Sequence, residues 1–206
     1  MRARDNPFAV QRLHGIPYRF MGTSWEELLE RLGALRFRAA VVGPHGRGKT
    51  TLLEELAQRL AERELRTRTV TLHEGDRRLS ATQRGVLFRS LTPRDVLFVD
   101  GAEQLGRFAW LEVRTRSRAA GGLVITSHRP GLLPTLLECR TTPELLAGIV
   151  AELAGPEESQ HLPAAGELLA RHGGNVRDAL RELYDLCADL TSPAVARRGS
   201  PSPPSR

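Results

Sequence analysis

The stretch from Gly43 to Thr50, GPHGRGKT, constrains this chain more than any other, because it matches the pattern Gly-x-x-x-x-Gly-Lys-Thr. An apolar run from Ala39 to Val42 precedes it, and a helix-period run from Thr51 to Leu60 follows it. Glycines in such a turn let backbone N–H groups surround phosphate oxygens, and the N-terminus of the following helix adds its dipole. The stretch therefore predicts a phosphate-binding strand–loop–helix unit, the P-loop.

The residue types in the loop suggest individual roles. The ammonium group of Lys49 is expected on the β/γ-phosphates of a nucleotide, and the Thr50 hydroxyl is expected to ligate Mg²⁺. Lys49 is also the single lysine among 30 Lys and Arg residues. A compact ammonium fits inside a phosphate loop where a planar guanidinium would not. The predicted nucleotide-contacting residues are Gly43, Pro44, His45, Gly46, Arg47, Gly48, Lys49, Thr50 and Thr51.

Composition bounds the class of protein. At 206 residues, 40% hydrophobic and 26% charged, the chain suits one domain, or one domain with a small appendage. No apolar run approaches the ~20 residues of a membrane span, and the N-terminus lacks the apolar segment of a signal peptide, so we expect a cytoplasmic protein without membrane insertion. Cys139 and Cys187 show no metal-type spacing and are expected to be free thiols.

Strand and helix patterns alternate through most of the chain. Strands are expected at 38–42, 67–72, 95–100, 122–128 and 136–140, and helices at 24–35, 51–63, 82–91 and 107–118. After Pro143 the pattern is wholly helical, with helices expected at 144–153, 163–171 and 175–190. This order predicts an α/β fold, a three-layer P-loop NTPase core with a parallel sheet and a small C-terminal helical lid. The expected division is an irregular lead-in (1–22), a core (23–142), a lid (143–190) and a disordered tail (191–206).

An acidic residue closes the most apolar strand pattern. The run from Val96 to Val99 ends on Asp100, the Walker B form, in which a carboxylate stands at the C-terminal end of a buried parallel strand. Asp100 is expected to hold Mg²⁺ opposite Thr50, although an aspartate here can also simply cap a helix. The next strand ends in Thr126 and Ser127, whose hydroxyls either meet the γ-phosphate or attacking water or satisfy local backbone groups.

Together these motifs resemble the AAA+ type of P-loop ATPase, with a lid similar to those of clamp-loader and replication-initiator ATPases. The residues from Thr126 to His128 match the sensor-1 position of that family, and 173–180 resemble its sensor-2 pattern. The resemblance implies ATP and Mg²⁺ as ligands, hydrolysis to ADP and phosphate, and an arginine that reaches a phosphate from the lid. That arginine is Arg177, just after the helix-capping Asn175; the alternative is a solvated or Asp-paired side chain.

The chain departs from the family pattern at the catalytic carboxylate. A glutamate usually follows the Walker B aspartate, but here the next residue is Gly101 and the nearest acid is Glu103. A positioned general base contributes ~10²–10⁴ in rate. If Glu103 does not reach the attacking water, the protein binds ATP and hydrolyses it slowly, as a switch. The resemblance also implies an arginine from a neighbouring subunit; Arg129 is the candidate and Arg140 the fallback, and both also have structural interpretations.

Other functions remain open at this stage. A small P-loop kinase would use the same loop, with arginines from 73–94 clamping a second substrate, and a non-hydrolysing ATP-sensing module would act through a protein partner. A GTPase needs a second lysine to read guanine, and an ABC-type ATPase needs more than the roughly 30 residues between Lys49 and Leu79.

Nucleic acid is a further candidate partner. A net charge of +6 permits an anionic partner, although the positive excess is spread along the chain. The basic helix pattern at 107–118 predicts either a phosphate-backbone track or a solvated charged face. Its arginines are Arg107, Arg114, Arg116 and Arg118.

Overall fold

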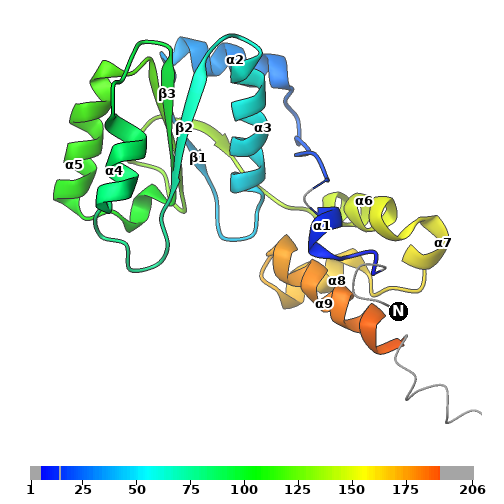
Figure 1. The fold of residues 1–206 in the computed structure, drawn as a ribbon. Coiled ribbons are helices and arrows are strands. Elements are labelled where there is room, and N and C mark those ends of the chain that lie inside the picture. Colours follow the sequence, from blue (N-terminus) through cyan, green and yellow to red (C-terminus); the bar gives the residue numbers. More distant parts are fainter. Residues whose placement is uncertain (1–5, 14, 191–206) are drawn as a thin grey trace, which may run out of the picture. The chain divides into compact units, whose positions relative to one another are not determined.

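The computed structural model describes residues 6–13 and 15–190, which form two compact units (Figure 1). The larger unit spans Tyr18–Arg140, and the smaller one joins the chain before Tyr18 to the chain from Thr141 onward. The sequence-based boundaries placed residues 1–22 in a separate lead-in and began the lid at residue 143. The predicted disordered tail, 191–206, lies outside the described residues.

The larger unit is built on one parallel sheet of five strands in the order β2-β3-β4-β1-β5. The strands are β1 (Arg38–Val42), β2 (Arg66–Thr71), β3 (Asp95–Asp100), β4 (Gly122–Ser127) and β5 (Thr135–Glu138). Every residue of β3 and β4 is buried, as expected for central strands covered on both faces. The prediction of an α/β fold with a parallel sheet is confirmed, and β5 ends two residues before the expected Arg140.

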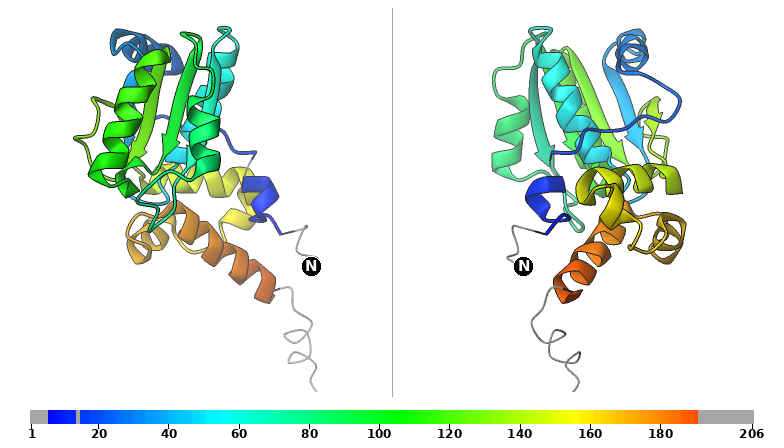
Figure 2. Two further views of the ribbon diagram at one scale, coloured as in Figure 1. Left: turned by 60° about the vertical axis from the view of Figure 1, so that its left-hand side comes forward. Right: turned by 90° about the vertical axis from the view of Figure 1, so that its right-hand side faces the viewer.

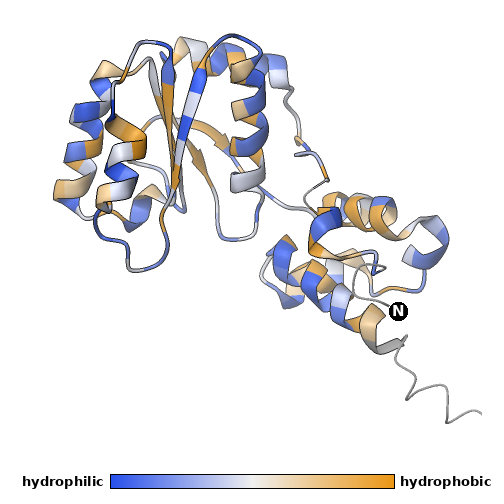
Figure 3. Ribbon diagram, viewed as in Figure 1, coloured by the Kyte–Doolittle hydropathy of each residue, from blue (hydrophilic) through white to orange (hydrophobic). Residues whose placement is uncertain are grey.

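Helices cover both faces of this sheet. On one face lie α2 (Trp25–Ala34) and α3 (Lys49–Ala61), and on the other lie α4 (Ala81–Phe88) and α5 (Arg107–Arg116), as Figures 1 and 2 show. Two short 3₁₀ helices, η2 (Ala102–Gln104) and η3 (Ser117–Ala119), follow β3 and α5. The central strands β3 and β4 are mostly apolar, whereas the strand β2 at the edge of the sheet is largely polar (Figure 3). The result is a three-layer core with the carboxyl ends of all strands at one edge.

A buried aspartate fixes the start of β3. Asp95 is 1% exposed, and its carboxylate accepts hydrogen bonds of 2.7 Å from both N–H and Oγ1 of Thr92. Nε of Arg68, on the neighbouring strand β2, lies 3.0 Å from Oδ1 of Asp95. Since a buried charge is tolerated only when it is paired and hydrogen-bonded, this network explains an acid at a core position.

The smaller unit is helical. It contains α1 (Val10–Leu13), α6 (Pro143–Ala154), α7 (Pro156–Ser159), α8 (Ala165–Arg171) and α9 (Val176–Leu190). Phe8, 1% exposed, packs in its core with residues of α6, α8 and α9. Nδ2 of Asn6 also donates a 2.8 Å hydrogen bond to the Tyr184 carbonyl. Part of the segment expected to be an irregular lead-in, residues 6–13, therefore belongs to this helical core, whereas the larger unit begins at Tyr18. The short helix α7 is an additional turn that begins at Pro156 after Gly155.

Candidate functional site

The phosphate loop joins β1 to α3 at the carboxyl edge of the sheet, and two glycines explain its course. A Cβ atom at Gly43 would lie 2.8 Å from the Cys139 carbonyl oxygen. Gly48 has a φ of 79° and caps α3, and the Tyr18 ring lies against it, 3.2 Å from the place of a Cβ. Close approach at the first position and left-handed backbone at the second both require glycine.

The lysine of the loop is buried within the loop itself. Lys49 is 9% exposed, and its Nζ donates hydrogen bonds to the carbonyl oxygens of Gly43 at 2.6 Å and Pro44 at 2.8 Å. Phosphate oxygens are stronger partners for an ammonium than neutral carbonyls are. When a phosphate binds, Nζ of Lys49 can therefore exchange these two carbonyl partners for phosphate oxygens.

Three side chains from three elements meet beside this lysine. Oγ1 of Thr50 donates a 2.9 Å hydrogen bond to Oδ2 of Asp100, and Oγ1 of Thr126 donates one of 2.5 Å to Oδ1. The N–H of Gly101 donates to the Thr126 hydroxyl at 2.8 Å, which fixes its direction. A hydroxyl and a carboxylate side by side are the oxygen ligands that Mg²⁺ prefers, with water completing its shell, so Thr50 and Asp100 fit this ion.

Ser127 has a different setting from Thr126. Its Oγ donates to the Arg129 carbonyl at 2.7 Å and accepts from the Arg129 N–H at 3.3 Å, which closes a local turn after β4. The Arg129 side chain is exposed. Between the two hydroxyls that the sequence singled out, Thr126 is thus the one that contacts Asp100, and a phosphate contact for Ser127 stays a prediction.

Glu103 lies in η2 and contacts His128, which in turn contacts His45. Its Oε1 is 3.2 Å from Nε2 of His128, and its Oε2 is buried with no hydrogen-bond partner among the described residues. The His45 ring, from the phosphate loop, meets the His128 ring edge-on with centroids 3.8 Å apart. Burial, chiefly, lowers the pKa of His128; the Lys49 and His45 charges act in the same direction, and Glu103 opposes them.

The two remaining predicted arginines lie elsewhere. Oδ1 of Asn175 accepts the Asp178 N–H at 3.3 Å, which caps α9 and leaves Arg177 exposed in its first turn. Arg177 belongs to the smaller unit, so its role toward a phosphate stays a prediction. Arg140 forms a surface ion pair of 2.8 Å with Glu138.

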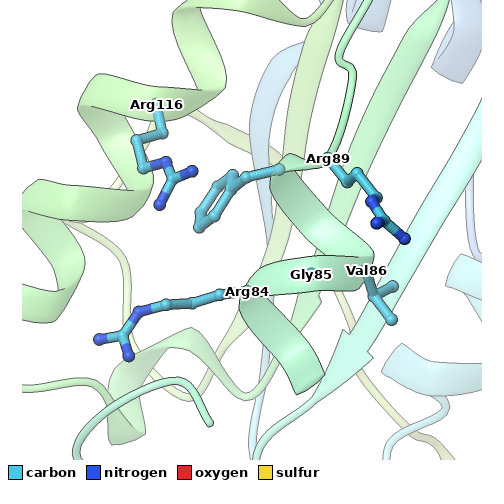
Figure 4. Close-up of a pocket in the computed structure, with 6 residues that line it drawn as sticks. Arg84, Gly85, Val86, Arg89 and Arg116 are labelled. Carbon is cyan, nitrogen blue, oxygen red and sulfur yellow. The ribbon is translucent and has the colours of Figure 1, made fainter. Parts of the chain in front are cut away.

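A kinase would use arginines of 73–94 to clamp its second substrate. Two of these, Arg84 and Arg89, line a cavity of about 610 Å³ on the outer side of α4 and α5 (Figure 4). Nε of Arg84 pairs with Glu112 at 3.0 Å, and Arg116 lies over the Phe88 ring at 4.4 Å. Helices α4 and α5 end beside this cavity. The chain continues from them to the starts of β3 and β4, which lie at the sheet edge opposite the phosphate loop. These side chains therefore do not flank the loop. The cavity is lined by Arg84, Gly85, Val86, Phe88, Arg89 and Arg116.

Sequence patterns did not reveal the side chains that pack against the phosphate loop. The Tyr18 hydroxyl donates to Sγ of Cys139 at 3.4 Å while its ring packs on Gly48, and burial raises the pKa of both groups. Neither Cys139 nor Cys187 takes part in a disulfide within the described residues. No local pattern marks a contact between residues this far apart in the chain. The pairing of His45 with His128 has one sequence signal, since His128 ends the strand predicted at 122–128 and His45 follows the strand predicted at 38–42.

Searches for related proteins found likeness in structure only. No protein-family model matches the sequence, and no curated protein matches it. Structures of RuvB from Thermotoga maritima are similar. One, described as a Holliday junction branch migration motor, has 22% identity, a TM-score of 0.50 and coverage of 77% of this chain and 58% of that chain. Two mutant forms give 20% and 22% identity, TM-scores of 0.53 and 0.55, and coverage of 82% and 81% of this chain.

This likeness shows the fold. The chain spans 65% and 62% of the two mutant RuvB chains, and thus less than two thirds of their length. Its core shares the fold of these RuvB structures, with a parallel sheet between two layers of helices, and a helical C-terminal part is also present. In the described part of the chain no helix is long and apolar enough to cross a bilayer.

Proposed function

We propose that this chain is an ATPase of the AAA+ type that binds ATP with Mg²⁺ at Gly43–Thr50 and acts as a nucleotide-driven switch. The observation that carries the proposal is the meeting of Thr50, Asp100 and Thr126 beside the buried Lys49. Three chain segments far apart in sequence there bring together groups that suit a phosphate and a hard cation. The AAA+ type of fold supports the same conclusion.

The chain's own groups divide the work of hydrolysis. Loop N–H groups and the N-terminus of α3 bind phosphate oxygens, and Lys49 adds a charge at the β/γ-phosphates. Thr50 and Asp100 would hold Mg²⁺, which neutralises charge on the phosphates when bound. Glu103 is the carboxylate available to accept a proton from the attacking water, since no residue in the described part of the chain forms a hydrogen bond with its Oε2.

The first experiment measures binding and turnover separately. Wild-type protein should melt at a higher temperature with ATP and Mg²⁺, because a ligand of the folded state stabilises it by RT ln(1 + [L]/Kd). Lys49→Ala should lose most of this shift, whereas Arg114→Ala, an exposed control on α5, should keep it. Absence of any ATP-dependent shift in the wild type would reject the proposed function. Glu103→Gln should bind ATP and hydrolyse it at least tenfold more slowly, because it removes the proposed general base.

We further propose self-association that depends on the γ-phosphate. The exposed Arg129, which follows β4, would reach the nucleotide of a neighbouring copy. Its positive charge would pair with the γ-phosphate, which ADP lacks. Sedimentation with a slowly hydrolysed ATP analogue should show an assembly that ADP does not produce and that Arg129→Ala abolishes. Monomers under both conditions would remove the trans-arginine from the proposal.

DNA is the partner proposed for one face of the core, as the description of the RuvB motor suggests. Helices α4 and α5 carry four arginines and one acid, Glu112, whereas α2 on the opposite face carries three glutamates and one arginine, and α3 carries two of each charge. Arg107→Ala/Arg114→Ala should weaken binding to duplex DNA and flatten its salt dependence, and Arg31→Ala/Arg59→Ala on the opposite face should not. Equal, salt-insensitive binding by all three proteins would leave α5 as a solvated face. The four arginines are Arg84, Arg107, Arg114 and Arg116.

A further inference from the structure

Three titratable side chains from separate elements converge beside the phosphate loop. His45 belongs to the loop, Glu103 to η2 after β3, and His128 follows β4. The Glu103 carboxylate lies 3.2 Å from the His128 imidazole, which in turn lies against the His45 ring with a centroid distance of 3.8 Å. A chain of contacts thus runs from the phosphate loop to the one carboxylate proposed as a base.

The two oxygens of this carboxylate differ. Oε1 is taken by Nε2 of His128, whereas Oε2 is buried and has no hydrogen-bond partner among the described residues. A buried acceptor without a donor is unfavourable, and such atoms occur in native proteins mainly where a ligand, a water or a reaction supplies the donor. The geometry therefore leaves a single oxygen of Glu103 for a water molecule.

The protonation state of His128 suits the role of orienting the Glu103 carboxylate. Burial lowers its pKa below the ordinary 6.5, with Lys49 and His45 acting in the same direction against Glu103, so the neutral imidazole prevails at pH 7. With its proton on Nε2, a neutral imidazole donates one hydrogen bond to Oε1 and orients the carboxylate. An imidazolium would instead form an ion pair and make Glu103 a weaker base.

We propose that His128 is a positioning residue: its Nε2–H holds Oε1 of Glu103 so that Oε2 receives the proton of the water that attacks ATP, while His45 fixes the His128 ring from the phosphate loop. This inference rests on the proposed ATPase function. In the step, the water oxygen bonds to the γ-phosphorus, the bond to the β–γ bridging oxygen breaks, and ADP leaves with that electron pair. The proton on Oε2 then passes to solvent.

The test compares two amides at position 128. The Nε2 of a glutamine superposes on Nε2 of histidine and can donate to Glu103, whereas the amide of asparagine is one bond shorter and reaches only the place of Nδ1. His128→Ala and His128→Asn should lower kcat for ATP about tenfold or more, because the general base loses its orientation, with the Kd for ATP changed less than threefold. His128→Gln should recover most of the wild-type kcat, and the control His73→Ala should match wild type.

A double-mutant cycle separates positioning from a merely structural role. If His128 acts through Glu103, then His128→Ala should cause no further loss of kcat in a Glu103→Gln background, because the two residues act as one unit. Additive losses, or equal rates for His128→Gln and His128→Asn, would overturn the inference. A normal kcat in His128→Ala together with a low kcat in Glu103→Gln would also overturn the inference about His128, but it would leave the proposed ATPase function intact. Failure of the wild type to bind ATP would instead reject the function itself. Melting temperatures of all variants identify any that do not fold, and the glutamine–asparagine comparison remains if alanine is one of them.

Discussion

Gly101 passes so close to Leu72 that a Cβ atom at position 101 would lie 2.8 Å from the Leu72 carbonyl oxygen. Its φ of 84° is also left-handed, which side chains disfavour. Because Gly101 directly follows Asp100, this contact explains why no glutamate stands at the position typical of AAA+ ATPases. The turn brings in η2 at once, and the next acid, Glu103, comes from that 3₁₀ helix.

Gly101→Ala should therefore destabilise the larger unit by about 1–3 kcal/mol, the cost of a strained backbone position. Chemical denaturation followed by circular dichroism measures it. Gly85→Ala is the matched control, since Gly85 lies within α4 with open space around it. That change should stabilise the protein by roughly 0.5–1 kcal/mol through helix propensity. Equal effects of the two substitutions would contradict the role of the Leu72 contact.

Thr126→Val should weaken the effect of Mg²⁺ on ATP binding. The side chain is fully buried, and its hydroxyl bonds both Asp100 and the Gly101 N–H, so valine would free the carboxylate and leave a buried N–H unpaired. The folded state should lose about 1–3 kcal/mol as well. Thermal shifts with ATP over a Mg²⁺ titration measure both effects. Ser127→Ala, which removes only the turn to Arg129, should keep the wild-type Mg²⁺ dependence; an unchanged dependence in Thr126→Val would contradict the assignment.

Asp95 should give the core a pH-dependent stability. Burial acts to raise its pKa, but hydrogen bonds from Thr92 and Arg68 outweigh burial and hold the pKa below the ordinary 3.8. The folded state thus binds protons less readily than the unfolded chain, so this stabilisation is present above pH 3.8 and is lost as the pH falls below it. Asp95→Asn should cost about 3–5 kcal/mol at pH 7, as for a broken buried pair, and the two proteins should converge in acid.

Urea unfolding at pH 7 and pH 3 tests this expectation. Glu138→Gln is the control, since its ion pair with Arg140 is exposed and surface pairs contribute about 0–1 kcal/mol. A constant difference between wild type and Asp95→Asn at both pH values would show that the carboxylate charge is not what stabilises the start of β3.

Sequence patterns predicted the strand, loop and helix around Gly43–Thr50 and the acid at the end of β3 because both depend on residues that are contiguous in the chain. Which of Thr126 and Ser127 contacts Asp100 does not depend on contiguous residues. Neighbouring side chains on a strand point to opposite faces, and β4 is buried on both, so its apolar pattern does not reveal which hydroxyl faces Asp100. The pairing of β3 with β4, with Val99 opposite Ile125, decides it.

The smaller unit shows the same limit at longer range. Phe8 packs against helices that begin more than a hundred residues later, and the Asn6 side chain bonds the Tyr184 carbonyl. Turn-forming residues around this segment predicted irregular backbone, but burial depends on what packs against it, which local patterns do not encode. The Tyr18 ring against Gly48 is a contact of the same kind.

Lys49→Arg should abolish ATP binding although it keeps the positive charge. Nζ of Lys49 is bonded to the carbonyls of Gly43 and Pro44 inside the loop, and the side chain is 9% exposed, so the larger planar guanidinium has no room there. The reverse change on the same helix, Arg59→Lys, should leave ATP binding intact and cost only the stacking on Trp25 at 4.4 Å, about 0.5–1 kcal/mol. Thermal shifts with and without ATP measure both. If Lys49→Arg retained the full ATP-dependent shift, charge alone would explain the lysine, and the confined geometry of the loop would not be the reason that the chain's single lysine stands at this position.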